Sequence, residues 1–266
     1  MKVENKVIIV TGGGNGMGRE IVLNLLSKGA KVIAIDINEL ALKETVDLSG
    51  SNKNSLATFV VDITKREAVE NFKEQAIALF GAVDGIINNA GIIQPFVKFN
   101  DLGYDVIERV FNVNLWGTLY MAKTFLPHLL TRPEAHIVNI SSMGGFLPVP
   151  GQTIYGGAKA AVKLITEGLR SELLNSNVKV TIVFPGAINT NIKANSGLKV
   201  EANAGSHSNK ALLPSIAADI IIYAMETNKA RVMVGKDAKF MDFLVRLNPA
   251  KASKLIFEKM KSKLEY

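Results

Sequence analysis

The chain has 266 residues, 48% of them hydrophobic, and no cysteine, so a large buried core is feasible while disulfides and thiolate chemistry are excluded. The formal net charge of +7 at pH 7 is unevenly spread, because residues 229–266 carry ten Lys or Arg against four Asp or Glu, and the remainder carries twenty-one against twenty. A nearly neutral body argues against nucleic-acid binding as the main task. The sequence contains no run of about eighteen apolar residues, so no membrane span is expected.

Short apolar runs alternate with helical patterns along the whole chain. We expect strands at residues 6–10, 31–35, 57–61, 83–87, 137–140, 178–184 and 231–234. The spacing of Ile21, Val22, Leu25 and Leu26 predicts a first helix after the first strand. Further helices are expected at residues 39–48, 65–80, 104–130, in the stretch that carries Tyr155 and Lys159, and at residues 214–227. This alternation predicts an α/β fold: a Rossmann-like, doubly wound parallel sheet of about seven strands with helices on both faces, forming a single domain over residues 1–235.

A glycine loop joins the first strand to the first helix. The sequence from Thr11 to Gly18 reads T-G-G-G-N-G-M-G, with the spacing Gly12-x-x-x-Gly16-x-Gly18. Backbone N–H groups and the positive end of the helix would face an anion there, and the missing side chains would let a pyrophosphate approach. Asp36 ends the second strand, where a carboxylate accepts hydrogen bonds from a ribose diol and repels a 2′-phosphate, so the pattern favours NAD over NADP. The alternative is a loop that only turns a strand into a helix.

A serine, a tyrosine and a lysine follow the fifth strand. Tyr155 and Lys159 are four residues apart on one helix face, and Ser142, just beyond the carboxyl end of the preceding strand, can reach the same point. An ammonium about 4 Å from a phenol contributes about 4 kcal/mol at an effective dielectric of about 20, which lowers the phenol pKa by about three units before desolvation. Such a phenol can move a proton on and off an alcohol or carbonyl oxygen. The alternative is an incidental tyrosine beside a surface lysine.

Six motifs, in one order, carry a resemblance to a known family. They are Thr11-Gly12-x-x-x-Gly16-x-Gly18, Asn88-Asn89-Ala90-Gly91, Asn114, Ser142, Tyr155-x-x-x-Lys159 and Pro185-Gly186. Over residues 5–234 the chain resembles the short-chain dehydrogenase/reductases. The resemblance implies an NAD(P)-dependent oxidoreductase whose cofactor-binding residues are Gly12, Asn15, Gly16, Met17, Gly18, Asp36, Ile37, Asp62, Ile63, Asn89, Ala90, Gly91, Tyr155, Lys159, Pro185, Gly186, Ile188 and Thr190.

The same resemblance implies four catalytic residues. Tyr155 would be the general acid/base, and Lys159 would lower the pKa of Tyr155 and bind the nicotinamide ribose. Ser142 would orient the substrate oxygen. Asn114 would hold a water that links Lys159 to solvent, and a hydrogen-bonded helix kink is the alternative for this residue.

Other residues near these motifs have structural interpretations. Asp62 would contact the adenine in the family, or else cap the helix at residues 65–80. Asn88 and Asn89 could tie neighbouring strands together through their amides. Ser141 is expected to be structural, because Ser142 has the family's separation from the tyrosine.

The reaction we expect is the NAD(H)-dependent interconversion of a secondary alcohol and a ketone. The substrate would be lipophilic, steroid-like or acyl, because the expected pocket walls beside Ser142 are mostly apolar: Gln94, Phe96, Met143, Phe146, Gln152 and Ile188. Residues 191–213 are polar and weakly periodic, which favours a mobile lid over the substrate. The three histidines have no metal-ligand spacing, so no metal is expected. The alternatives are a non-catalytic dinucleotide-binding sensor and a 3-oxoacyl-thioester reductase.

Residues 236–266 predict a basic, amphipathic helical extension. Such an apolar stripe packs on the body or on a sister subunit, or the basic helix rests on an anionic membrane or binds an acidic carrier. The family resemblance implies a homo-oligomer, a dimer or tetramer, through the helices that carry Asn114 and Tyr155. The amino terminus shows no long apolar secretion signal, so we expect a cytoplasmic protein, with membrane association through the extension left open.

Overall fold

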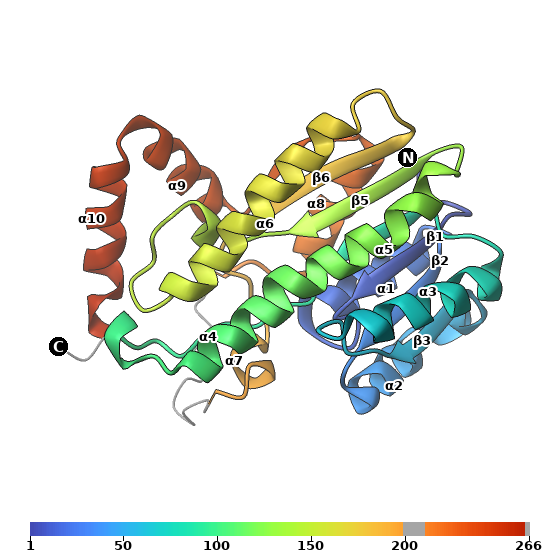
Figure 1. Ribbon diagram of the computed structural model, residues 1–266, viewed down its shortest axis with the longest axis horizontal. Helices are drawn as coiled ribbons and strands as arrows, with labels where there is room; N and C mark the ends of the chain where they lie inside the picture. Colours follow the sequence, from blue (N-terminus) through green and yellow to red (C-terminus); the bar gives the residue numbers. More distant parts are fainter. Residues whose placement is uncertain (199–210, 264–266) are drawn as a thin grey trace.

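The computed structural model describes residues 1–198 and 211–263 and contains one seven-stranded sheet (Figure 1). All neighbouring strands are parallel, in the order β3-β2-β1-β4-β5-β6-β7. The strands are β1 (Val7–Thr11), β2 (Lys31–Asp36), β3 (Leu56–Val60), β4 (Gly85–Asn88), β5 (Ala135–Ile140), β6 (Val178–Pro185) and β7 (Arg231–Val234). The predicted Rossmann-like, doubly wound fold is confirmed, and the predicted strand ends differ from these by at most two residues.

The helices lie between these strands in the chain and after the last one. They are α1 (Gly16–Ser27), α2 (Glu39–Leu48), α3 (Arg66–Phe80), α4 (Tyr104–Phe111), α5 (Thr118–Leu130), α6 (Thr153–Glu172), α7 (Ile192–Asn195), α8 (Pro214–Glu226), α9 (Lys236–Leu247) and α10 (Pro249–Met260). Residues 199–210, the middle of the predicted lid, are outside the described residues. Within the described residues, no helix combines the length and apolar character needed to cross a membrane.

Helices cover both faces of the sheet, as the buried side chains of β1 show. Ile8 and Val10 point to one face, where they join a core built with α1 and α8. Val7 and Ile9 point to the other face, where the core includes side chains of α3 and α5. Successive strand residues face opposite sides, so a strand covered on both faces must be apolar throughout. This explains why the sequence shows continuous apolar runs and not alternating ones.

The helix predicted at residues 104–130 is interrupted in the middle. Between α4 and α5 the segment Asn112–Gly117 is π-helical. Asn114 lies in this segment and is fully buried, and its backbone carbonyl accepts a hydrogen bond of 3.0 Å from the Thr118 hydroxyl. A π segment widens the turn and releases backbone carbonyls from their usual partners, and such segments are frequent at functional sites.

The direction of strand order reverses between β1 and β4, which are neighbours in the sheet but not in the chain. The connections that leave the carboxyl ends of these two strands diverge to opposite faces, so a crevice opens there. The glycine loop after β1 and the asparagine motif after β4 both border this crevice. The fold therefore directs the predicted motifs to one edge of the sheet.

The extension forms two helices, α9 and α10, at one end of the molecule beside the loop between β5 and α6 (Figure 1). Met241 of α9, Ala252 and Ile256 of α10 and Leu147 of that loop form a small separate core. One apolar side of the extension therefore packs on the body, which is one of the alternatives that the sequence leaves open.

Candidate active site

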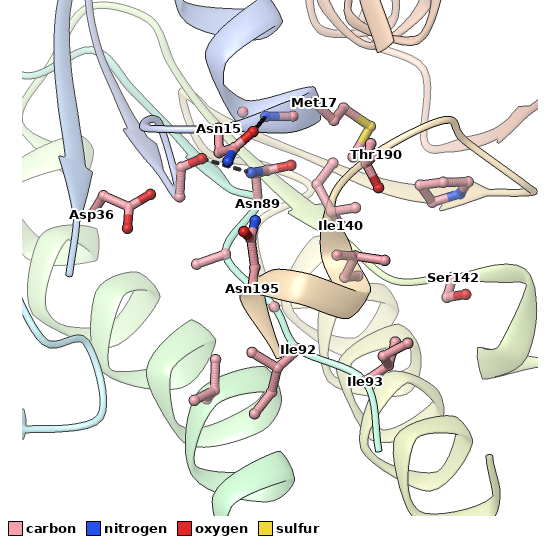
Figure 2. Close-up of a pocket in the computed structure, with 18 of the residues that line it drawn as sticks. Asn15, Met17, Asp36, Asn89, Ile92, Ile93, Ile140, Ser142, Thr190 and Asn195 are labelled. Atoms are coloured by element: carbon pink, nitrogen blue, oxygen red, sulfur yellow. Dashed lines mark hydrogen bonds between the residues drawn. The ribbon is translucent and has the colours of Figure 1, made fainter. Parts of the chain in front are cut away.

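A cavity of about 620 Å³ lies at the carboxyl ends of the strands, around the point where the strand order reverses. Figure 2 shows Asp36 at one side of this cavity and Ser142 at the other, with Asn15, Asn89 and Thr190 between them. Every residue predicted to bind the cofactor lines the cavity, as do Ser142, Phe96 and Ile188 from the predicted substrate wall. The structure thus brings together, from seven separate segments, residues that are up to 178 positions apart in the sequence.

The glycine loop is held in a conformation that other residues would not adopt. Gly12 and Gly16 have φ angles of +67° and +53°, in the left-handed region that favours glycine. A Cβ on Gly18 would overlap the Gly12 carbonyl, so this residue too must be glycine for the loop to close on α1. The Arg19 guanidinium donates to the Gly14 carbonyl at 2.6 Å and fixes the loop from behind. The loop is therefore open toward the cavity, as close approach of a pyrophosphate requires.

Asp36 is oriented by two backbone amides. Gly14 N–H donates to its Oδ2 at 3.1 Å, and Asn38 N–H donates to its Oδ1 at 3.0 Å. Each carboxylate oxygen keeps a lone pair for another donor, and the side chain lines the cavity. An arrangement of this kind suits the two hydroxyls of a ribose, and no basic side chain follows in Ile37 or Asn38.

Thr11 and Asn89 join the glycine loop to the end of β4. The Thr11 hydroxyl accepts hydrogen bonds from the amides of Asn89 and Ala90, at 3.0 and 2.9 Å. The Asn89 side chain donates to the Thr11 carbonyl at 3.1 Å. In the neighbouring strand pair, Asn88 Nδ2 donates to Asn139 Oδ1 at 2.8 Å. These amides tie neighbouring strands together, the structural role that the sequence allowed for them.

Ser142, Tyr155 and Lys159 line the opposite part of the cavity. Ser142 follows β5 and its Oγ accepts from Gly144 N–H at 3.1 Å, which fixes the serine at the edge of the cavity. Lys159 is only 3% exposed, and its Nζ donates to the Ile140 carbonyl at 2.9 Å. The neighbouring Ser141 is buried and its hydroxyl donates to the Lys159 carbonyl at 2.7 Å, which is the structural role expected for it.

The ionisation of this group differs from the expectation. Burial raises the pKa of the Tyr155 phenol above its ordinary value, while a hydrogen bond with Ser142 acts in the opposite direction. Burial lowers the pKa of Lys159 to about 8. The expected net acidification of Tyr155 by Lys159 is therefore wrong for the protein alone, because desolvation, which was expected to offset only part of the lowering, is the largest effect on the pKa of this phenol.

Asn114 lies behind the cavity wall and not on it. Its side-chain amide forms a pair of hydrogen bonds with the backbone of Ile92, accepting from the N–H at 3.0 Å and donating to the carbonyl at 2.8 Å. A Cβ on Gly91 would lie 2.8 Å from Asn114 Oδ1 and 3.2 Å from Lys159 Nζ. The side chain thus fixes the segment after β4 against the lysine, and the water relay stays a prediction.

Four residues expected in the substrate wall do not line the cavity. Gln94 is fully buried, and its Oε1 accepts from the amides of Ile154 and Tyr155 at 2.8 and 2.9 Å, so it caps the start of α6. Gln152 is buried beside it and donates to the Gln94 carbonyl at 2.8 Å. Gln94 therefore serves the backbone at the start of the tyrosine helix, and Gln152 serves the backbone of the segments that precede it, so neither side chain lines the cavity.

Met143 and Phe146 are also turned away from the cavity. Both pack against the small core that the extension forms with the loop after β5. The Phe146 ring also meets Phe184 edge to face, with the ring centroids 5.5 Å apart. These two apolar side chains, which the sequence predicted for the substrate wall, therefore pack against the core of the extension.

Other wall residues escaped the sequence reasoning. Ile92 and Ile93 follow the asparagine motif directly, and Ile192 and Asn195 lie at the start of the predicted lid (Figure 2). Ser196 holds that segment down, because its hydroxyl accepts from Ile93 N–H at 2.9 Å. Adjacency to the Asn-Asn-Ala-Gly motif was the available signal for the two isoleucines. Asp62, predicted as a cofactor contact or a helix cap, lines the cavity and accepts from the Thr64 amide, and the N-cap position of α3 is occupied by Lys65, which forms no side-chain cap hydrogen bond.

Comparisons with known proteins identify the family of the chain. The short chain dehydrogenase family model matches residues 6–201. SadH of Mycobacterium tuberculosis, named as an oxidoreductase, is 37% identical over 261 residues, covering 95% of this chain and 94% of that protein. An uncharacterised oxidoreductase of Staphylococcus aureus is 35% identical over 225 residues, covering 85% and 93%.

Solved structures show the same fold. A short-chain dehydrogenase/reductase from Burkholderia phymatum in complex with NAD is similar with a TM-score of 0.84 and 25% identity, covering 93% of this chain and 96% of that one. A short-chain dehydrogenase from Burkholderia cenocepacia in complex with NADP has a TM-score of 0.81 and 24% identity, covering 96% and 99%. With the match over most of its length and the motif residues gathered around one cavity, this chain belongs to the short-chain dehydrogenase/reductase family of oxidoreductases.

Proposed function

We propose that the protein is an NAD(H)-dependent oxidoreductase that interconverts a secondary alcohol and a ketone. The observation that carries the proposal is the single cavity that has Asp36 on one side and Ser142, Tyr155 and Lys159 on the other. The Tyr155 phenol, which can donate a proton, and the Ser142 hydroxyl, which can orient a substrate oxygen, thus line the same cavity as the glycine loop and Asp36, which suit a dinucleotide. The glycine loop, which added side chains would fill, fits a pyrophosphate between the two ends.

The preference for NAD rests on Asp36. Its carboxylate is fixed by two amides and faces the cavity, so it can accept hydrogen bonds from both ribose hydroxyls. A 2′-phosphate at this place would meet a negative charge, and the absence of a basic residue in the next two positions leaves that repulsion uncompensated.

In the proposed reaction, Tyr155 transfers the proton, and Ser142 and Lys159 support it. Tyr155, whose pKa burial keeps high, is protonated at neutral pH and can donate to the oxygen of a ketone. Ser142 accepts from a backbone amide through its Oγ and forms a hydrogen bond with Tyr155, so the two hydroxyls lie together and can both meet the same substrate oxygen. Lys159, held by the Ile140 carbonyl, places a buried cation behind the tyrosine. When bound, NAD(H) would exchange the hydride, and the positive charge of its oxidised ring would favour the phenolate.

The substrate we propose is lipophilic. The wall of the cavity that holds Ser142 and Tyr155 includes Ile92, Ile93 and Ile188. A ligand with few polar groups gains by leaving water for such a wall, whereas a strongly polar ligand would lose hydrogen bonds there. The carbonyl or hydroxyl that reacts would be the one polar group met by Ser142 and Tyr155.

A panel of alcohols tests the reaction class. The purified chain is mixed with NAD⁺ and short, cyclic, steroid or 3-hydroxyacyl-thioester alcohols, and the absorbance of the reduced cofactor is followed. We expect turnover with apolar secondary alcohols and less with NADP⁺. Turnover confined to acyl thioesters would select the 3-oxoacyl-thioester reductase, the alternative within the same chemistry.

A non-catalytic dinucleotide sensor is the alternative of a different class, and Tyr155→Phe separates the two. The substitution removes the proton donor while keeping the ring, so we expect turnover to fall by about a hundredfold or more, with NADH affinity measured by fluorescence unchanged. Thr153→Ala, at an exposed position on the same helix, is the matched control. A wild type that binds NADH but turns over no carbonyl or alcohol in the panel would favour the sensor.

We also propose that the chain forms a homo-oligomer through α5 and α6. A groove of about 350 Å³ runs between these helices, lined among others by Leu119, Leu126 and Ile165. Trp116, in the π-helical segment just before α5, and Leu164 of α6 are exposed large apolar side chains. Sedimentation velocity tests this proposal: Leu164→Glu should shift a dimer or tetramer toward monomer, and a monomeric wild type would contradict it.

A further inference from the structure

The extension has a second apolar side that does not pack on the body. Phe240, Phe243 and Leu247 are 54%, 64% and 71% exposed. Their spacing of three and four residues places them on one face of α9. The face toward the body is formed by Ala238 and Met241, which are buried. A surface helix needs one apolar face to fold, so the second face calls for a partner.

Positive charges flank this outward face. Lys236 lies one turn before Phe240, and Lys239 one turn before Phe243, and both lysines are exposed. Lys251, also exposed, follows just after Leu247 at the start of α10.

The acidic residues in the described part of the extension already have partners. Asp237 accepts from Ala187 N–H at 2.7 Å. Asp242 accepts from Arg231 and Arg246, and Glu258 accepts from Lys261. The outward face of α9 therefore combines aromatic and aliphatic side chains with a cationic border.

This composition distinguishes between partners. Aromatic and leucine side chains between lysines are the features of helices that lie in the surface of an anionic membrane, with the apolar row among the acyl chains and the cations at the headgroups. A second copy docking by the same face would place the lysines of one chain against those of the other, because a two-fold contact repeats the same residues on both sides.

The helix is also fixed in place before any partner arrives. The Asp237 contact ties its first turn to the loop after β6, and Arg231 of β7 is ion-paired with Asp242 in its middle. The Arg231 guanidinium also stacks over Phe184, 4.5 Å from the ring centroid. A rigid helix presents its outward row without the entropic cost of ordering it on binding.

We propose that the outward face of α9, formed by Lys236, Lys239, Phe240, Phe243 and Leu247, binds the surface of anionic phospholipid membranes. The enzyme would then be a peripheral membrane protein. The proposal does not depend on the reaction that the cavity catalyses.

Vesicle co-sedimentation of the full chain tests the proposal. Vesicles of phosphatidylcholine alone are compared with vesicles that contain phosphatidylglycerol, each at low and high salt. We expect binding to the anionic vesicles and its loss at high salt, because surface charges are screened. Equal binding to both vesicle types, or binding to neither, would overturn the proposal.

Two variants localise the binding. Lys236→Glu with Lys239→Glu should weaken binding to anionic vesicles by about tenfold or more, and Phe240→Ser with Phe243→Ser should abolish it even at low salt. Leu48→Ser, at an exposed apolar position on α2, is the control and should bind like the wild type. NADH binding and the thermal midpoint of each variant check that it is folded.

Two results would assign the face to something else. Wild-type binding by a folded Phe240→Ser, Phe243→Ser variant would overturn the proposal. If the same variant lost self-association in sedimentation velocity without lipid while vesicle binding was unchanged, α9 would be a contact between copies of the chain.

Discussion

In the body of the molecule, strands β1, β4 and β5 are buried along their whole length, whereas α9 of the extension is buried on one side and leaves Phe240, Phe243 and Leu247 exposed on the other. Charge differs in the same way, since the surplus of Lys and Arg is concentrated in residues 229–266. The body buries these strands between its own helices and holds the reactive groups. The extension forms its small core together with the loop after β5, and other apolar and basic side chains of α9 are exposed.

The difference teaches where changes should matter. If the body alone forms the site, substitutions in it should alter chemistry or cofactor binding strongly, and substitutions in the extension weakly. Besides the small apolar core, the links between the regions include two polar contacts, Asp237 with the Ala187 amide and Arg231 with Asp242. The predictions below use the first contact and three buried or cavity-facing groups of the body.

Lys159 should make stability depend on pH. Its folded-state pKa of about 8 is below the ordinary 10.5, so between these values the unfolded chain binds more protons and stability rises with pH. Below about pH 8 the lysine is charged in both states and the cost of burying it is fully present. The free energy of unfolding of the wild type should therefore rise by about 2–3 kcal/mol from about pH 7 to pH 10 relative to Lys159→Met.

Urea denaturation at several pH values measures this effect. Lys239→Met, which removes an exposed lysine of α9, is the matched control and should follow the wild type. If the free energy of unfolding changed with pH in the same way for the wild type and Lys159→Met, the buried lysine of the body would behave like an exposed lysine of the extension, which would contradict the prediction.

Asp36→Ala should erode the preference for NAD. The substitution removes a charged acceptor of ribose hydroxyls and the repulsion of a 2′-phosphate, so the ratio of kcat/KM for NAD over NADP should fall by about 30-fold, or about 2 kcal/mol. Steady-state kinetics with both cofactors measure the ratio, with Asp47→Ala on the surface of α2 as the control. An unchanged ratio would refute the assignment of Asp36.

Gln94→Leu should impair catalysis more than cofactor binding. It leaves the amides of Ile154 and Tyr155 without their acceptor at the start of α6, which costs about 1–2 kcal/mol and displaces the tyrosine. We expect kcat to fall by about tenfold with little change in NADH affinity. Gln94→Glu keeps the acceptor and should restore kcat, and Gln75→Leu on the surface of α3 is the control. A loss of NADH binding equal to the loss of kcat would assign Gln94 to general folding.

Asp237→Ala should have the smallest effect. It removes one exposed hydrogen bond to the Ala187 amide, beside the turn that lines the cavity, so NADH affinity should weaken by about fivefold, or about 1 kcal/mol. Asp237→Asn keeps an acceptor and should bind NADH like the wild type, and Glu258→Ala on α10 is the control. An effect on NADH affinity larger than that of Asp36→Ala would break the comparison, because the extension would then be part of the site.

The sequence alone predicted the succession of strands and helices along the chain and the motif residues that line the cavity, though not the wall residues Ile92, Ile93, Ile192 and Asn195. These depend on local patterns: continuous apolar runs, a glycine spacing that only a tight loop requires, and Tyr155 and Lys159 on one helix face. Such patterns keep their meaning whatever packs against them.

Only the tertiary structure decided the roles of side chains whose partners are distant in the chain. Gln94 and Gln152 cap and brace α6, Met143 and Phe146 serve the core of the extension, and burial reverses the expected direction of the Tyr155 pKa. Each of these outcomes depends on which groups exclude water around the residue. The desolvation of a side chain depends on all the groups that surround it in the folded protein, and residue spacing along the sequence does not specify those groups.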